Sequence, residues 1–572
     1  MTQQEATKLT PVGKILSVLL VLALVAIGGW LVYAKWGGMT SPIAHDSGPK
    51  IESSDPKNAE PVTTVSKYAY VAAEKLPPVK GVSGYKWDTT TKTVRFTYNV
   101  WSGWLPVIAA NHGTKANDDS IFWKKYGFHV ELVLMDDPVT ARDAYAAGDV
   151  HTLWGTVDMM VLFVPELVRD SRTAPRIVQQ VDWSSGGDGI VVRSGIGNVA
   201  SLRGRTVALA NNSPSQYYLT SLLLSAGMKP GDVKTKYTAT AFEAAAAFAG
   251  DKSIDACVSW SPDIYKIPER DKNAHILSST KDASKLIADV YAIRADFCRD
   301  HPDVVEGLVA GIFEGMEMVK KDPVQPAKWM ADAFGMKPED VMDMRNDAHP
   351  TNFAENIQFF LNASNPTNFE RTWKNASYVY RELGTIEPKD LKSFDQVMDF
   401  SVVQGLDKRG LFKDQKDESV ATFTPGSVIP ATAEKILTQT IRINFYPNSA
   451  NPYELAHDVD GIAIPGKLYD PNVDPTLERV GHLAGQFGRA TILIEGHADS
   501  SMKGRVPEQA VKDLSTQRAE AIKQALVAKF KFDPNKFQVA GRGWDVPANP
   551  DDKNNQSLNR RVEISVFPTE QQ

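Results

Sequence analysis

The segment from Ser201 to Val233 reads SLRGRTVALANNSPSQYYLTSLLLSAGMKPGDV and predicts a strand followed by a helix. Its apolar run Thr206 to Ala210 suits a buried strand, and Ser215 to Ala226 suits a helix that begins after Pro214. Other segments repeat the alternation: strands at Thr93 to Trp101, Phe128 to Met135 and Ile254 to Ser259, and helices at Asp137 to Gly148 and Ala241 to Gly250. This alternation predicts an α/β fold of βαβ units around largely parallel sheets.

The composition is that of an ordinary globular protein. Hydrophobic residues make up 42% of the 572 residues, charged residues 23%, and the formal net charge is −6. These values exclude a disordered or collagen-like chain, and they argue against nucleic acid as a partner, which usually needs a basic surface. Two cysteines, Cys257 and Cys298, exclude a disulfide scaffold and a cysteine-rich metal site. The two cysteines could form one disulfide or remain two free thiols, and we expect free thiols.

Residues 15–34 read ILSVLLVLALVAIGGWLVYA and contain no charge. As a helix they would span roughly 30 Å, the thickness of a bilayer's hydrocarbon core. Trp30, Tyr33 and Trp36 stand at the far end, where aromatic side chains favour the headgroup region. A cleaved signal peptide is the alternative, although its apolar core is usually only about 7–15 residues long. We therefore expect a signal anchor at 15–36, a cytoplasmic N-terminus at 1–14, and a single-pass inner-membrane protein with its bulk in the periplasm.

Two segments poor in periodic pattern divide the rest of the chain. Residues 37–90 are rich in Gly, Ser and Pro and are predicted to be a linker. Residues 411–435, which include TFTPGSVIPATA, are predicted to be a second linker. The folded domains are then expected at 91–410 and 436–568, with a mostly helical stretch from Pro302 to about Gly405.

The first predicted domain contains four segments whose order and spacing are informative. They are WSGWLP from Trp101 to Pro106, the segment from Ser201 to Val233, AFEAAAAFAGDKSIDACVSWSPDI from Ala241 to Ile264, and AIRADFCRDHPDVVEGLV from Ala292 to Val309. In order and spacing they resemble periplasmic solute-binding proteins of the nitrate/sulfonate/taurine group. The resemblance implies a two-lobed type II periplasmic-binding-protein fold, a small-molecule solute as ligand, and an ABC permease or another envelope protein as a further partner.

Ligands of open α/β sheets bind at the carboxyl ends of strands, where loops converge. Four loops qualify here: Trp101 to Trp104, Gly155 to Asp158, Asn211 to Tyr217, and Trp260 to Asp263. Tryptophans would supply flat apolar walls, and Asn212 or Ser213 would cap a helix whose free N–H groups attract negative charge. This favours an anionic or zwitterionic organic solute. The predicted contacts are Trp101, Trp104, Thr156, Asp158, Ser213, Gln216, Tyr217, Trp260 and Asp263. Core packing is the alternative for the tryptophans, and loop or helix capping is the alternative for Ser213 and the aspartates.

The second predicted domain carries three motifs: ILIEGHADSS (Ile492 to Ser501), LSTQRAEAIKQAL (Leu514 to Leu526) and SLNRRVEI (Ser557 to Ile564). They closely resemble the OmpA-like peptidoglycan-binding domain, an α+β domain. The resemblance assigns Asp499 and Arg518 to the diaminopimelate of the peptidoglycan stem peptide and places Asn559 near that pocket. The chemistry is consistent, because an arginine grips a carboxylate bidentately while an aspartate accepts hydrogen bonds from an ammonium group. A plain surface salt bridge between the two residues is the alternative.

No enzyme motif accompanies these domains. The sequence lacks GxSxG, GxxxxGK[ST] and HExxH, and its ten histidines are scattered. We therefore expect no catalytic residue, metal site or cofactor. Two functions remain: capture of a solute by a protein anchored in the inner membrane and held to peptidoglycan, or a structural tether or sensor whose two-lobed domain binds protein.

Overall fold

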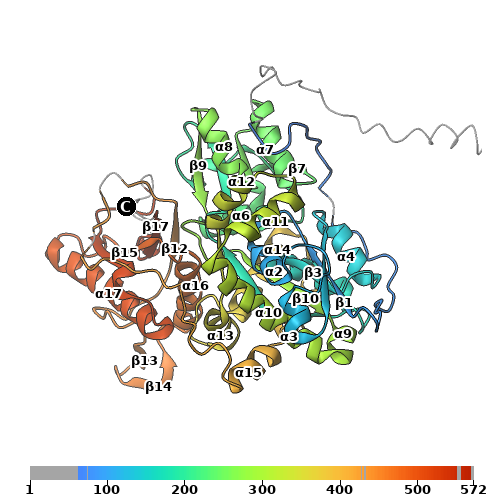
Figure 1. Ribbon diagram of the computed structural model, residues 1–572. Coiled ribbons are helices and arrows are strands. Elements are labelled where there is room, and N and C mark those ends of the chain that lie inside the picture. The colour runs from blue at the N-terminus through green and yellow to red at the C-terminus, as the bar shows by residue number, and fades with distance from the viewer. Residues whose placement is uncertain (1–61, 74, 427, 431–432, 550–555, 569–572) are drawn as a thin grey trace, which may run out of the picture. The chain divides into compact units, whose positions relative to one another are not determined.

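The computed structural model describes residues 62–73, 75–426, 428–430, 433–549 and 556–568 (Figure 1). The predicted cytoplasmic N-terminus and signal anchor lie outside these residues. Among the described helices, none has both the length and the apolar character that crossing a membrane requires.

The first lobe is built on two sheets that are joined side by side. Strands β1 (Thr93–Tyr98) and β2 (His129–Leu134) pair in parallel. The second sheet has the order β11-β4-β10-β3, from β3 (Thr152–Thr156), β4 (Pro175–Ser184), β10 (Ala288–Arg294) and β11 (Ala348–Pro350). Thr97 links the two sheets, since its hydroxyl donates to the Thr152 carbonyl at 2.9 Å.

The second lobe is a five-stranded sheet of order β7-β6-β8-β5-β9. Its strands are β5 (Asp188–Arg193), β6 (Thr206–Ala210), β7 (Lys234–Thr238), β8 (Ala256–Trp260) and β9 (Ala274–Ser279). Helices α6 (Pro214–Ser225), α7 (Ala241–Gly250) and α8 (Asp263–Arg270) belong to this lobe. Two short connections, from β4 to β5 and from β9 to β10, join the lobes.

The α/β class is confirmed, but the expectation of largely parallel sheets is wrong. Strand β6 runs parallel to β7 and β8, whereas β5 runs antiparallel to β8 and β9. Strand β10 is likewise antiparallel to both β3 and β4. The reason is topological: β5 and β10 enter their sheets from the opposite lobe, so no crossover helix on the same sheet forces them to be parallel.

Helices complete the first lobe and the region after it. The stretch from Pro302 is mostly helical, as predicted, and its longest helix buries a stripe of apolar side chains that includes Val305, Leu308 and Ile312. The helices are α2 (Leu105–Asn111), α3 (Ile121–Tyr126), α4 (Pro138–Ala146), α5 (Val157–Leu167), α9 (Ala295–Asp300), α10 (Pro302–Lys321), α11 (Val324–Phe334), α12 (Pro338–Met344), α13 (Phe353–Leu361), α14 (Phe369–Leu383) and α15 (Ser401–Lys408).

The C-terminal domain is an α+β unit with a four-stranded sheet of order β12-β17-β15-β16 (Figure 1). Its strands are β12 (Leu437–Ile441), β15 (Thr491–His497), β16 (Phe537–Gly543) and β17 (Val562–Phe567), and its main helices are α16 (Val473–Gln486) and α17 (Glu508–Phe530). The segment between β12 and α16 forms a hairpin of β13 (Leu455–His457) and β14 (Ala463–Leu468).

The second half of the predicted first linker is part of the two-lobed domain. The Thr64 backbone N–H and hydroxyl both donate to Asp263 Oδ1, at 2.8 and 2.7 Å, on the second lobe. Further along, Ser83 N donates to the Ala146 carbonyl, and Arg294 donates to the Ser83 carbonyl, on the first lobe. The described residues of 62–90, called the strap below, therefore contact both lobes instead of forming a free linker.

Candidate functional site

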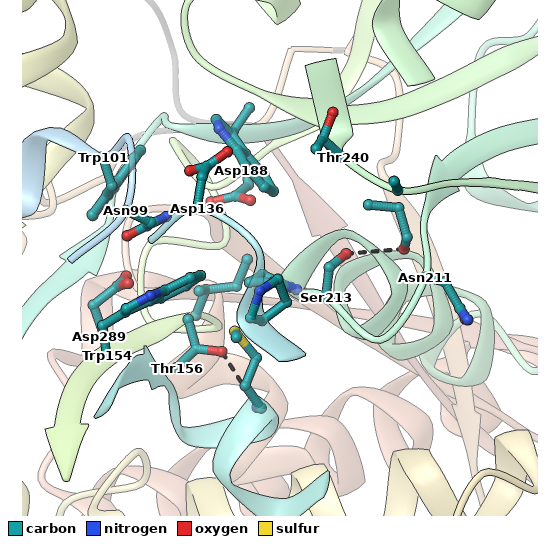
Figure 2. Close-up of a pocket in the computed structure, with 17 residues that line it drawn as sticks. Asn99, Trp101, Asp136, Trp154, Thr156, Asp188, Asn211, Ser213, Thr240 and Asp289 are labelled. Carbon is teal, nitrogen blue, oxygen red and sulfur yellow. Dashed lines mark hydrogen bonds between the residues drawn. The ribbon is translucent and has the colours of Figure 1, made fainter. Parts of the chain in front are cut away.

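A cavity lies at the edge where the two lobes meet. It comprises about 620 Å³ of atom-free space, which includes open solvent at its mouth. Figure 2 shows Trp101, Trp154 and Asp289 on one side of it and Thr240, Ser213 and Asn211 on the other. The lining residues are Asn99, Trp101, Asp136, Pro138, Trp154, Thr156, Met159, Asp188, Ala210, Asn211, Ser213, Pro214, Ala239, Thr240, Trp260, Ile287 and Asp289.

The strand directions explain why these residues meet. Trp260 ends β8 and pairs with Asp188, which begins β5. Thr156 ends β3 and pairs with Asp289, near the beginning of β10. Because β5 and β10 run antiparallel to these neighbours, their amino ends share an edge with the carboxyl ends of β8 and β3. The cavity sits on that shared edge.

The indole of Trp101 forms a wall that is fixed by its surroundings. Its Nε1 donates to both carboxylate oxygens of Asp182, at 3.2 and 3.3 Å. Gly187 makes room for the ring, since a Cβ atom at this position would lie 2.1 Å from the Trp101 indole. Trp154 is fixed in a similar way, by donation from its Nε1 to the Met135 carbonyl at 2.8 Å. Both rings are thus preorganised before any ligand enters.

Three carboxylates line the cavity and two more lie close to them. Asp188 is 5% exposed and accepts from the Ser184 hydroxyl at 2.7 Å. Burial raises the pKa of Asp188 to about 7, and the nearby Asp158 adds to that effect. Burial also raises the pKa of Asp182 to about 7, and it raises the pKa of Asp289 well above its usual value. Asp289 and Asp182 pair across β10 and β4 and share a hydrogen bond, so one proton serves both.

Asp136 completes the charged lining from the end of β2. Its Oδ1 accepts from the Val100 backbone N–H at 3.0 Å. Burial raises the pKa of Asp136, while the hydrogen bond from Val100 opposes the shift. The described lining contains no lysine, arginine or histidine. The cavity is therefore acidic and aromatic.

The structure brings together four of the nine residues predicted to bind the solute. Trp101, Thr156, Ser213 and Trp260 all line the cavity, and each of the four predicted loops contributes at least one lining residue. Ligand contact by these four residues stays a prediction. Ser213 precedes α6 without capping it through its side chain, because its hydroxyl donates to the Ala210 carbonyl at 2.9 Å.

The other five predicted residues lie outside the lining, and each has another role. Trp104 is buried in the core and donates to Asn99 Oδ1, while Asp158 accepts from the Tyr380 hydroxyl. Gln216 accepts from Asn212 N, and the Tyr217 hydroxyl accepts from Asn375 Nδ2. Asp263 faces the strap, where Thr64 holds it. Ligand contact by these five residues stays a prediction, although each of them packs or hydrogen-bonds within the protein and none lines this cavity.

Sequence reasoning missed the acidic residues of the lining. Asp136 carried a weak signal, since it follows a predicted strand, but the adjacent acids Asp136 and Asp137 suggest an ordinary loop. Asp188 and Asp289 carried no local signal, because they stand at the amino ends of strands, where ligand sites of parallel sheets are not expected. Their position follows only from the two connections between the lobes.

A second candidate site lies in the C-terminal domain, where α17 crosses the end of β15. Gly496 permits this approach, because a Cβ atom there would lie 2.1 Å from the Ser515 carbonyl oxygen. Asp499, on the loop after β15, accepts from Ser501 N at 2.8 Å and forms an ion pair with Arg560 at 2.7 Å. Burial opposes ionisation of Asp499, but the hydrogen bonds from Ser501 and Arg560 outweigh it and keep its pKa below the usual value.

Arg518 belongs to the same site. Its guanidinium lies 4.9 Å from the centroid of the Phe445 ring, its Nε donates to the Ser449 carbonyl at 3.1 Å, and it interacts electrostatically with Asp499. The predicted acid and base are therefore neighbours. Asn559 is 3% exposed and its Oδ1 accepts from Ala548 N at 2.8 Å, so this oxygen holds the loop before α18 (Gln556–Asn559). A role for Asn559 in binding stays a prediction.

Two family models match the chain, and both confirm the resemblances. One describes the OmpA family and matches residues 467–561; the other is NMT1/THI5-like and matches residues 116–326. The chain thus carries an OmpA-family domain at its C-terminus and an NMT1/THI5-like solute-binding domain before it.

Individual relatives match each of the two domains separately. The outer membrane protein Omp38 of Acinetobacter baumannii is 33% identical over 93 residues, 16% of this chain and 25% of that protein. The taurine-binding periplasmic protein of Escherichia coli is 26% identical over 212 residues, 36% of this chain and 63% of that protein. The chain therefore matches less than two thirds of either relative's length.

Solved structures give weaker similarities. The periplasmic aliphatic sulphonate binding protein SsuA from Escherichia coli aligns with a TM-score of 0.42 and 18% identity, over 53% of this chain and 91% of that one. The periplasmic nitrate-binding protein NrtA from Synechocystis PCC 6803 aligns with a TM-score of 0.42 and 15% identity, over 56% and 89%.

Proposed function

We propose that this protein captures a small organic solute and attaches non-covalently to peptidoglycan. The proposal starts from the two domains that the chain joins, an NMT1/THI5-like solute-binding domain and an OmpA-family domain. The observation that carries the first half is the cavity lined from both lobes, with tryptophan walls fixed by Asp182 and Met135. Binding leaves the solute chemically unchanged. The protein either passes the solute to an ABC permease or signals its presence to another envelope protein.

The proposed binding to peptidoglycan rests on the neighbouring side chains of Asp499 and Arg518. A diaminopimelate residue carries an ammonium and a carboxylate group on one carbon, so Arg518 receives the carboxylate and Asp499 the ammonium. In this arrangement the ligand ammonium takes the place that Arg560 holds beside Asp499.

The proposed location rests on one stretch of the sequence. The uncharged run at residues 15–34 would anchor the chain in the inner membrane as a single-pass protein, with both domains in the periplasm. The protein would then reach from the membrane to the peptidoglycan layer.

Sacculus pulldown of the purified full-length protein tests the peptidoglycan half. Asp499→Ala and Arg518→Ala are each expected to abolish sedimentation with purified sacculi. Arg442→Ala, which removes an exposed arginine of the same domain, is the matched control and is expected to bind like the wild type. Wild-type binding by the Asp499 and Arg518 variants would contradict the assignment.

A sensor is the second candidate function, and the strap favours it. This segment contacts Asp263 on one lobe and Ala146 on the other, so a change in lobe arrangement would alter its contacts. Hydrogen exchange of residues 62–90 with and without a bound solute separates the two functions. A sensor requires exchange to change on binding, whereas simple capture leaves it unchanged.

A further inference from the structure

The charge of the cavity lining identifies the class of solute, and this inference rests on the proposed solute-binding function. Asp136, Asp188 and Asp289 line the cavity, and Asp158 and Asp182 lie just behind the lining. In the part of the chain that the structure describes, no lysine or arginine forms an ion pair with any of these five carboxylates. Among the described residues their hydrogen-bond partners are neutral groups or one another: the Ser184, Thr156 and Tyr380 hydroxyls, Val100 N–H, the Trp101 indole and the bond shared by Asp182 and Asp289.

Burial of a carboxylate is costly unless a positive group or several hydrogen bonds compensate it. Asp188 is 5% exposed and Asp289 is 7% exposed, so neither has bulk water to solvate a full charge. Asp289 shares a hydrogen bond with Asp182, whereas Asp188 accepts, among the described residues, only from neutral donors such as the Ser184 hydroxyl, so a cation inside the cavity would supply Asp188 with a charged partner. An anion in the same place would meet like charges and no cationic side chain from the described lining.

The apolar walls suit the same kind of ligand. Trp101, Trp154 and Trp260 all line the cavity, and the faces of indole rings attract cations, with contributions of about 0.5–2 kcal/mol per contact. The indole nitrogen of Trp260 is buried and has no hydrogen-bond partner among the described residues. It can therefore donate to a ligand oxygen, such as a hydroxyl group.

Helix ends near the cavity do not reverse this preference. Helices α5 and α6 begin beside Thr156 and Ser213, and a helix N-terminus carries about half a positive charge. On α5, Thr156 Oγ1 already accepts from Met159 N, and Asp158 sits in the first turn. On α6, Pro214 occupies the first position and has no N–H to offer an anion. Neither helix adds a cationic side chain to the described lining, which stays acidic.

We propose that the cavity selects a small organic cation, an alkylammonium or amidinium compound, and not a sulfonate, nitrate or other anion. Asp188 and Asp136 pair with the positive group, and the three tryptophans enclose its apolar part. This differs from the anionic or zwitterionic solute that the helix-capping pattern around Ser213 predicted.

Isothermal titration of the purified full-length protein tests this with matched probes. Choline is compared with 3,3-dimethylbutan-1-ol, a neutral compound of the same shape, and with the anion isethionate and the zwitterion taurine; ethanolamine and benzamidine widen the cation set. At least one cation is expected to bind at least tenfold more tightly than every neutral or anionic probe.

Two variants and one control assign such binding to the carboxylates. Asp188→Asn and Asp136→Asn preserve side-chain shape and an oxygen that can accept from Ser184 or Val100, and each is expected to weaken cation binding at least tenfold. Asp119→Asn removes the same charge from a side chain that is 80% exposed, and it is expected to bind like the wild type.

The outcomes separate this inference from the proposed function. Binding of isethionate or taurine without any cation would overturn the inference and leave solute capture intact. Cation binding that survives in both Asp188→Asn and Asp136→Asn would also overturn it. Failure of every probe to bind would count against both.

Discussion

The hydroxyl of Thr280 lies 2.8 Å from that of Ser184 and ties together the two connections between the lobes. The same hydroxyl oxygen accepts from Gly186 N at 2.9 Å and from Asp188 N at 3.1 Å. Ser184 in turn donates to Asp188 in the cavity lining. The β4–β5 and β9–β10 connections are thus coupled at one point, directly beside the lining.

Thr280→Val removes this link while it keeps the side-chain shape. Two buried backbone N–H groups lose their acceptor, so we expect a destabilisation of about 1–3 kcal/mol. Guanidinium denaturation followed by tryptophan fluorescence measures the change. Thr235→Val, on the exposed part of β7, is the matched control and should shift the midpoint little. Equal midpoints for both variants would show that the link contributes nothing to stability.

Gly187→Ala is expected to disrupt the Trp101 wall. The added methyl group would lie 2.1 Å from the indole, so either the ring or the β4–β5 connection must move. Overpacking of this kind costs about 1–3 kcal/mol, and solute binding should be lost with it. Gly405→Ala, in α15 with no atom within 4 Å of the added methyl group, should instead be neutral or stabilise by up to about 1 kcal/mol. Thermal melts and titration check both, and unchanged ligand affinity in Gly187→Ala would contradict the role of the wall.

The strap should stabilise the second lobe through Thr64. Thr64→Val removes the hydroxyl donor to Asp263 and leaves the backbone donor at 2.8 Å. Burial raises the pKa of Asp263 to about 6 against the opposing hydrogen bonds from Thr64, so loss of the hydroxyl should raise it further. We expect a loss of about 1–2 kcal/mol, greatest above pH 6, where the carboxylate is charged. A loss that is the same at pH 5 and pH 8 would contradict this account.

Because of the acidic residues in the cavity lining, the stability of the folded protein should fall as pH rises, whereas its affinity for cations should increase. The pKa of Asp188 is about 7 in the folded chain and ordinarily near 3.8, so the folded state holds this proton more tightly. Its contribution to stability is therefore complete below pH 4 and is lost as pH rises to about 7. Asp188→Asn should flatten the fall of the thermal midpoint between pH 5 and 8.

Cation affinity should rise over the same interval, because the charged form of Asp188 binds the ligand. The titratable side chains that interact electrostatically with Asp188 are Asp158, Asp182, Asp289, Asp347, Tyr218 and Tyr265. Cation binding should therefore release protons, which titration in buffers of different ionisation enthalpy detects. An affinity for cations that falls between pH 5 and 8 would contradict the prediction.

Arg560→Ala should preserve sacculus binding. Arg560 pairs with Asp499 at 2.7 Å in the unliganded site, where it competes with an incoming ammonium group. Its removal is expected to leave binding within about threefold of the wild type, in contrast to Arg518→Ala, because solvent-accessible ion pairs contribute only about 0–1 kcal/mol. Quantitative sedimentation over a range of sacculus concentrations gives the comparison. A complete loss would instead make Arg560 part of the binding pair.

The sequence predicted some features well because they depend on neighbours along the chain. The strand Thr206–Ala210 was predicted at its exact bounds, and the helix after Pro214 was predicted to within one residue at each end, since an apolar run and a proline are local signals. The pairing of Asp499 and Arg518 in one site was also predictable, through the family motifs that hold them.

The chain by itself determined which segments become strands, helices and motif-bearing loops, because these follow from spacing and residue type over a few positions. Only the tertiary structure decided the charge of the cavity. Asp188 and Asp289 reach it because their strands cross from one lobe into the other and run against their neighbours. That reversal places amino ends beside the carboxyl ends of β8 and β3, a relationship between residues about 70 to 130 positions apart that no local pattern encodes.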